Sequence, residues 1–214
     1  MTVRMLVPIV PFFLVSTAYA NETIDEIVES VDAMRARVKD VTADFTQQKH
    51  TILLKKPLTS TGVVTIVESQ MRWDTRKPRR VTMYADGKEL WIYYPDQQKR
   101  EIYKTSKKLA RVTGAPFQRL ATLREFFDLK RLKDDDAGRA RIELSPKTDK
   151  LRDQIEVITL SVNLKTGFVE VVRTVDVEGD RTVITFANIK FNSDVDVKGV
   201  KPNIPDGTRT TIVD

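Results

Sequence analysis

Apolar residues recur at every second position through a series of short segments that begins at residue 41, and this period predicts a β-sheet fold. Turn residues separate the segments, and Asp86-Gly87 is a strong signal for a tight hairpin. Short strands at such close spacing predict an antiparallel meander that curls into a barrel or sandwich. Gly62, inside the second segment, indicates a bulge or bend. The six segments are residues 41–50, 58–68, 71–74, 79–85, 89–95 and 99–105.

A second series of alternating segments follows an interruption. We expect residues 106–132 to form a helical insertion of one or two short helices, with Leu120, Leu123 and Phe127 on one face and Phe117 near it. Strands are then predicted over 139–147, 155–167, 168–180 and 181–192, with one more short strand in the tail. About ten to eleven antiparallel strands exceed what an open flat sheet carries without curling. The fold class is therefore mainly β with helices, a curled antiparallel sheet whose concave face the helices can cover, which would leave an apolar interior.

One amphipathic helix precedes the strands. Within residues 21–40, apolar residues recur every three or four positions and form a single stripe. Thr23 and Glu26 have the spacing of a capping box at the start of this helix. The stripe must be buried against another element or act as a lid. Its members are Ile24, Ile27, Val28, Val31, Met34 and Val38.

The segment ELWIYYP, residues 89–95, is apolar on both faces, although a small sheet usually exposes one face to water. Trp91 and Tyr93 share one face, while Leu90, Ile92 and Tyr94 share the other. Either set could line the concave side, and each aromatic could also be ordinary core. We predict that the tryptophan face lines the cavity. The candidate binding residues of this cavity are then Ile66, Trp73, Met83, Trp91, Tyr93, Phe117, Leu120, Leu123 and Phe127.

The first twenty residues have the pattern of a secretory signal peptide. Arg4 precedes an apolar run, and Ala18-Tyr19-Ala20 forms a small-residue cleavage site. The run is shorter than a membrane span, although an uncleaved N-terminal anchor is the alternative. The chain has no cysteine that could carry a lipid anchor. We therefore expect an exported, soluble protein with one domain over residues 21–214.

The formal net charge of +6 comes from scattered basic pairs such as Lys55-Lys56. These pairs favour solvated strand edges and turns, and the alternative is attraction to an anionic surface such as lipid headgroups. No run resembles a nucleic-acid groove.

The spacing of residues in the sequence marks no catalytic constellation. The single histidine, His50, cannot form a histidine metal cluster, and in the polar stretch QQKHT it is better interpreted as a solvated turn residue than as the base of a Ser–His–Asp triad. No glycine-rich phosphate-binding motif is present, and Asp134-Asp135-Asp136 is better interpreted as a solvated turn than as a calcium loop. We expect neither a cofactor nor a metal. An enzyme is not expected, although a carboxylate hydrolase remains an alternative.

Several motifs together resemble the periplasmic outer-membrane lipoprotein carrier family LolA. They are FTQQ at 45–48, TGVVTIV at 61–67, MRWDTRKP at 71–78, DGKELWIYYPDQQ at 86–98 and Pro205-Asp206-Gly207. The resemblance implies an unclosed barrel with a helical lid over an apolar cavity. It also implies a monomeric periplasmic chaperone that takes acylated lipoproteins from an inner-membrane ABC-type extractor to an outer-membrane lipoprotein receptor.

The family's arginine–proline pair before the aromatic strand is absent here. The corresponding stretch is ESQMRW, residues 68–73. In the family, that arginine is associated with holding the lid. Its absence leaves open a diverged paralogue that carries another lipid or glycolipid, or a periplasmic regulator that senses lipids.

Overall fold

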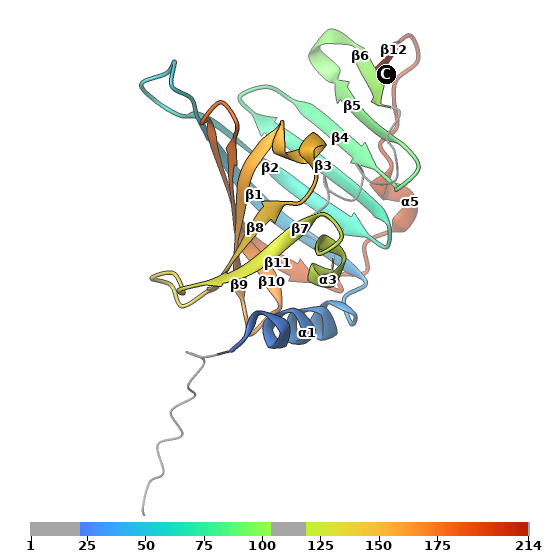
Figure 1. The fold of residues 1–214 in the computed structure, drawn as a ribbon. Helices are drawn as coiled ribbons and strands as arrows, with labels where there is room; N and C mark the ends of the chain where they lie inside the picture. Colours follow the sequence, from blue (N-terminus) through green and yellow to red (C-terminus); the bar gives the residue numbers. More distant parts are fainter. Residues whose placement is uncertain (1–21, 104–118, 214) are drawn as a thin grey trace, which may run out of the picture.

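The computed structural model describes residues 22–103 and 119–213, and the predicted signal peptide and Phe117 lie outside these ranges. The described strands form a single twelve-stranded sheet in the order β12-β6-β5-β4-β3-β2-β1-β11-β10-β9-β8-β7 (Figure 1). Neighbouring strands are antiparallel except for β12, which pairs parallel to β6. The two predicted series of strands join where β1 pairs with β11. Because β12 and β7 do not pair with each other, the barrel is unclosed, as predicted.

The strands are β1 (Asp40–His50), β2 (Leu58–Val67), β3 (Gln70–Lys77), β4 (Val81–Ala85), β5 (Leu90–Tyr94), β6 (Lys99–Tyr103), β7 (Phe127–Leu132), β8 (Ala140–Pro146), β9 (Ile155–Asn163), β10 (Phe168–Asp176), β11 (Arg181–Phe191) and β12 (Arg209–Val213). The helices are α1 (Ile24–Arg35), α3 (Leu120–Leu123), α4 (Asp149–Arg152) and α5 (Val197–Val200), with a 3₁₀ turn at Pro95–Gln97. None of the described helices is long and apolar enough to cross a membrane.

The sheet curves into a trough, and its register shifts contribute to this curvature because a bulged strand bends. One shift lies between Thr61 and Gly62, where the sequence predicts a bulge or bend. A Cβ atom on Gly62 would stand only 1.9 Å from the carbonyl oxygen of Asp74 and 2.7 Å from the Phe45 ring. Gly62 therefore lets β3 and the Phe45 side chain approach β2 closely.

The predicted helical insertion is partly wrong. Within its described part, Leu120–Leu123 is helical, but residues 127–132 form β7 instead. Phe127 is fully buried, whereas Asp128 and Lys130 are exposed, which is the alternation of a strand. Pairing with β8, in which Phe127 stands opposite Pro146, determines this structure. The extra strand raises the number of described strands to twelve.

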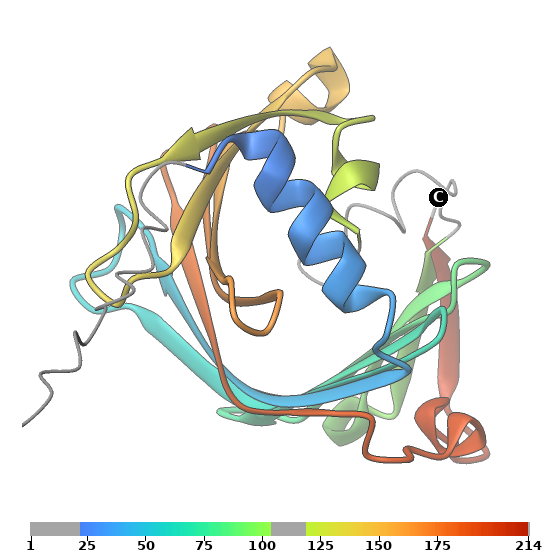
Figure 2. The same cartoon turned by 90° about the horizontal axis from the view of Figure 1, so that it is seen from below.

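Two apolar clusters explain why β5 is apolar on both faces. The larger cluster fills the concave side, between the sheet and the helices α1 and α3 (Figure 2). The smaller cluster lies on the opposite face of the sheet and packs against the segment that contains α5. Its buried members are Val67, Tyr84, Trp91, Tyr93 and Val200.

Candidate functional site

Helix α1 lies across the mouth of the trough and buries its apolar stripe in the larger cluster (Figure 2). The predicted capping box is present: the Thr23 N–H donates to Glu26 Oε2 at 2.7 Å, and the Glu26 N–H donates to Thr23 Oγ1 at 3.3 Å. Ile27 and Val31 are fully buried, and Val28 is nearly so. The stripe identified in the sequence is thus the surface by which α1 covers the concave face.

A buried carboxylate joins α1 to α3. Asp32 is only 4% exposed, and its two oxygens accept hydrogen bonds from the N–H groups of Leu120 at 2.7 Å and Ala121 at 2.9 Å. These N–H groups begin α3 and have no partner within that helix, so Asp32 satisfies them. Arg119 Nε lies 3.9 Å from the same carboxylate. The two covering helices are therefore linked by a charge-assisted contact.

The C-terminal turn of α1 is attached to the turn between β9 and β10. Arg35 Nε donates to the carbonyl oxygen of Gly167 at 2.9 Å. Burial removes water from the guanidinium and lowers the pKa of Arg35 to about 10. Gly167 has a φ of +70°, and a Cβ atom there would lie 2.9 Å from Met34 Cβ. A glycine at this turn therefore allows α1 to approach closely.

The wall opposite α1 is aromatic. Trp73 lies 4.3 Å from Phe45 and 5.9 Å from Phe186, measured between ring centroids. Met83 and Ile66 are partly buried and pack against the same cluster. The structure therefore brings together six of the nine predicted site residues: Ile66, Trp73, Met83, Leu120, Leu123 and Phe127.

The predicted face of the aromatic strand is wrong. Trp91 is 1% exposed and Tyr93 is 9% exposed, but both belong to the smaller cluster, on the face opposite to α1. Leu90, on the alternate face of β5, belongs to the larger cluster. Trp91 faces the other way because the segment around α5 returns to cover the outer face with Val195, Val197, Val200 and Ile204.

Sequence reasoning missed Phe45 and Phe186 as members of the concave wall. Phe45 continues the alternation of Val41 and Ala43 along β1, so the period of two was a signal for it. Phe186 stands opposite Phe45 in the register of β1 and β11. That neighbour could not be read from the sequence, because the two residues are far apart in the chain.

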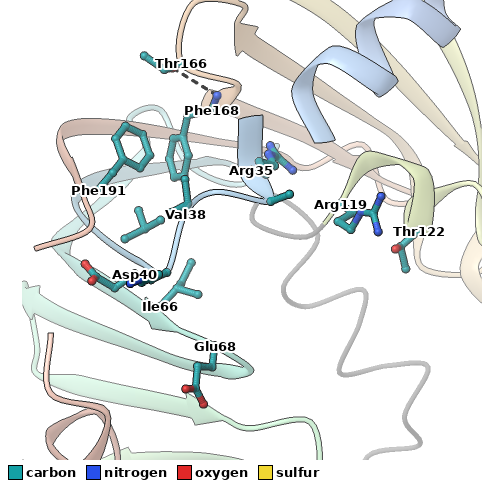
Figure 3. Close-up of a pocket in the computed structure, with 13 residues that line it drawn as sticks. Arg35, Val38, Asp40, Ile66, Glu68, Arg119, Thr122, Thr166, Phe168 and Phe191 are labelled. Atoms are coloured by element: carbon teal, nitrogen blue, oxygen red, sulfur yellow. Dashed lines mark hydrogen bonds between the residues drawn. The ribbon is translucent and has the colours of Figure 1, made fainter. Parts of the chain in front are cut away.

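A pocket of about 490 Å³ opens beneath the C-terminal end of α1 (Figure 3). Its apolar lining includes Ile66, Phe168 and Phe191, and its polar lining includes Arg35 and Arg119. Glu68, at the turn between β2 and β3, also lines the pocket and has a positive φ of 53°. This turn lies in the stretch ESQMRW, which corresponds to the position of the arginine–proline pair in the LolA family that the sequence resembles.

Within residues 22–103 and 119–213, no three His, Asp or Glu side chains form a group that could hold a metal ion. His50 ends β1 next to the loop that leads to β2. The apolar residues of the concave wall suit the binding of apolar groups.

Comparison with known proteins identifies the family. The profile described as outer membrane lipoprotein carrier protein LolA matches residues 36–199. An outer-membrane lipoprotein carrier protein of Pseudomonas fluorescens is 27% identical over 208 residues, which cover 96% of each chain. Its counterpart in Hahella chejuensis is 25% identical over 183 residues, covering 83% of this chain and 85% of that one.

Solved structures agree on the fold. An uncharacterised conserved protein from Thermus thermophilus superposes with a TM-score of 0.59 at 11% identity, covering 88% of this chain and 98% of that chain. At this identity, the match supports the architecture alone. The family profile spans most of the chain, so the protein belongs to the LolA family of outer-membrane lipoprotein carriers, which are transport proteins and not enzymes.

Proposed function

We propose that this protein is a periplasmic carrier that binds the acyl chains of lipoproteins between α1 and the concave face of the sheet. It takes its cargo from an inner-membrane ABC-type extractor and delivers it to an outer-membrane lipoprotein receptor. Membership of the carrier family and the secretory pattern of the first twenty residues support this proposal.

One observation carries the proposal: α1 covers the trough with an apolar stripe, and the concave face beneath it is also apolar, so an acyl chain could bind between them. Ile27, Val28 and Val31 are buried against the concave wall. An acyl chain would replace these contacts as α1 moves away. Each buried methylene of the acyl chain contributes about 0.8 kcal/mol to binding. Because α1 must expose its apolar stripe to let the chain in, the cost of that exposure lowers the net affinity. Such a balance permits both uptake and release.

The polar contacts of α1 substitute, in this proposal, for the family's missing arginine–proline pair. Asp32 holds α3 through two N–H groups, and Arg35 holds the carbonyl of Gly167. Both contacts join α1 to neighbouring elements. They keep the lid closed without a ligand, and they must break or rearrange when cargo enters.

Displacement of a hydrophobic dye by a synthetic acylated peptide tests this function. The same peptide without its acyl chains is the matched control. We expect saturable displacement of the dye by the acylated peptide and none by the control peptide. We also expect lipid that copurifies with the protein to be detectable by mass spectrometry. If the dye finds no site, or if both peptides displace it equally, the proposed function is wrong.

A further inference from the structure

Large exposed apolar side chains gather at one end of the molecule. In the described part of the chain, six such side chains are exposed; four of them lie on two hairpin connections, and a fifth, Leu58, is the first residue of β2. Ile52 is 83% exposed and Leu53 is 91% exposed, so both project almost completely into solvent. The five are Ile52, Leu53, Leu54, Leu58 and Val177, which we call the apolar tip.

The two connections of the apolar tip lie side by side. Strand β1 pairs with β2 on one side and with β11 on the other, so Lys49 stands opposite both Leu58 and Thr182. Ile52 Cδ1 lies 4.0 Å from the position that a Cβ on Gly179 would occupy. Figure 1 shows the connection between β1 and β2 projecting beyond the sheet, away from α1. The tip is therefore one surface, separate from the lid.

Basic side chains border this surface. Lys55 and Lys56 directly follow the apolar residues, are exposed, and form no ion pair with any described residue. The neighbouring turn carries acidic residues, but Asp180 pairs with Lys49 at 3.1 Å and Asp176 accepts N–H groups of its own turn. Glu178 is the exposed carboxylate that offsets part of the lysine charge. The two free lysines give the tip a positive border.

We propose that the apolar tip docks on an anionic lipid bilayer, with its aliphatic side chains in the headgroup region and Lys55 and Lys56 at the phosphates. Apolar side chains beside lysines bind reversibly at such an interface. Lysine stems can bury their methylenes while the ammonium group stays at the charged layer.

A protein partner fits this surface less well. A stable protein interface covers about 800 Å² on each partner, with roughly 20–30 residues a side. The tip offers only five apolar side chains, on two narrow connections and the first residue of β2, and these project outward instead of forming a broad face. A bilayer requires no shape complementarity, so a small projecting patch is sufficient. The inference does not depend on the identity of the cargo.

Cosedimentation of the mature protein with vesicles tests this docking. We expect binding to vesicles that contain phosphatidylglycerol, and much weaker binding to pure phosphatidylcholine. The double substitution Ile52→Asp with Leu53→Asp should reduce partitioning at least tenfold. Replacing Lys55 and Lys56 with Gln should reduce it by about fivefold for each lysine. The matched control is Ile212→Asp, an exposed apolar residue away from the tip, which should bind like the wild type.

Dye displacement by acylated peptide, measured on the same variants, should stay unchanged because the tip lies away from α1. It therefore separates failure of docking from failure of cargo binding. Absence of binding to phosphatidylglycerol vesicles would overturn the proposal, as would equal binding by the wild type and the tip variant. Capture of a protein partner through the tip, without any binding to lipid, would overturn it as well.

Discussion

At the scale of single residues, Asp32 joins the two helices that cover the concave face. Replacing it with Ala leaves the N–H groups of Leu120 and Ala121 without their acceptors in a buried position. Hydrogen bonds to a charged group contribute roughly 1.5–3 kcal/mol each. We expect Asp32→Ala to lower the free energy of unfolding by about 2–4 kcal/mol in urea titrations. A loss within experimental error would show that the contact does not hold the helices together.

Gly62 gives a second test at this scale. A Cβ atom there would meet the backbone carbonyl of Asp74, which cannot rotate away as a side chain can. We expect Gly62→Ala to destabilise the protein by about 2–3 kcal/mol, because β2 and β3 must separate. Gly199→Ala is the matched control, since its Cβ would lie 3.9 Å from the nearest atom. Equal melting temperatures for the two variants would contradict the close approach of β3 to β2 at Gly62.

Asp135 makes stability depend on pH. Burial acts to raise the pKa of this carboxyl, but hydrogen bonds from Arg139 and Ala137 outweigh burial and lower the pKa below its ordinary value. A carboxyl with a lowered folded-state pKa stabilises fully above about pH 4, its unfolded value, and loses that effect as the pH falls through the folded value.

Asp135→Asn should therefore cost about 1–2 kcal/mol at pH 7 and progressively less at more acidic pH. Urea midpoints of the wild type and the variant, measured from pH 7 to pH 2.5, would check this. A difference that stays constant with pH would assign the loss to packing instead of charge.

At the scale of elements, α1 is attached to the body by one face, whereas β1 is paired along both edges. The contacts of α1 include its apolar stripe, Asp32, Arg35 and the ion pair between Asp25 and Arg124, while β1 forms ladders with β2 and β11. Elements with fewer contacts open at a lower free energy. We expect the amides of α1 to exchange faster than those of β1, and Asp32→Ala to speed exchange in α1 alone. Equal protection of α1 and β1 would contradict a lid that opens by itself.

The elements differ in how well the sequence predicts them. The helix over residues 21–40 follows from its stripe and its cap, because both signals are local, although it ends at Arg35. Phe127 was assigned to the wrong element because its spacing from Leu120 and Leu123 also fits a helix. The competing signal, alternation with Asp128 and Lys130, covers only six residues. Pairing with β8 decides between them, and that pairing is a tertiary contact.

At the scale of the whole molecule, the sheet has one face for α1 and another for the C-terminal segment. The sequence predicts the curled sheet, its helical cover and the two apolar faces of β5. It does not show which face turns inward, because the covering residues around Val200 are more than a hundred positions from Trp91. The two tryptophans consequently lie on opposite faces, with Trp73 inside and Trp91 outside.

This separation makes tryptophan quenching the most direct test of where cargo binds. A brominated acyl ligand quenches only an indole that it contacts. In Trp91→Phe, Trp73 is the single tryptophan of the chain, and we predict saturable quenching of its fluorescence. In Trp73→Phe, Trp91 remains beneath the C-terminal segment, and its fluorescence should stay unchanged. Quenching of Trp91 without quenching of Trp73 would contradict binding between α1 and the concave face.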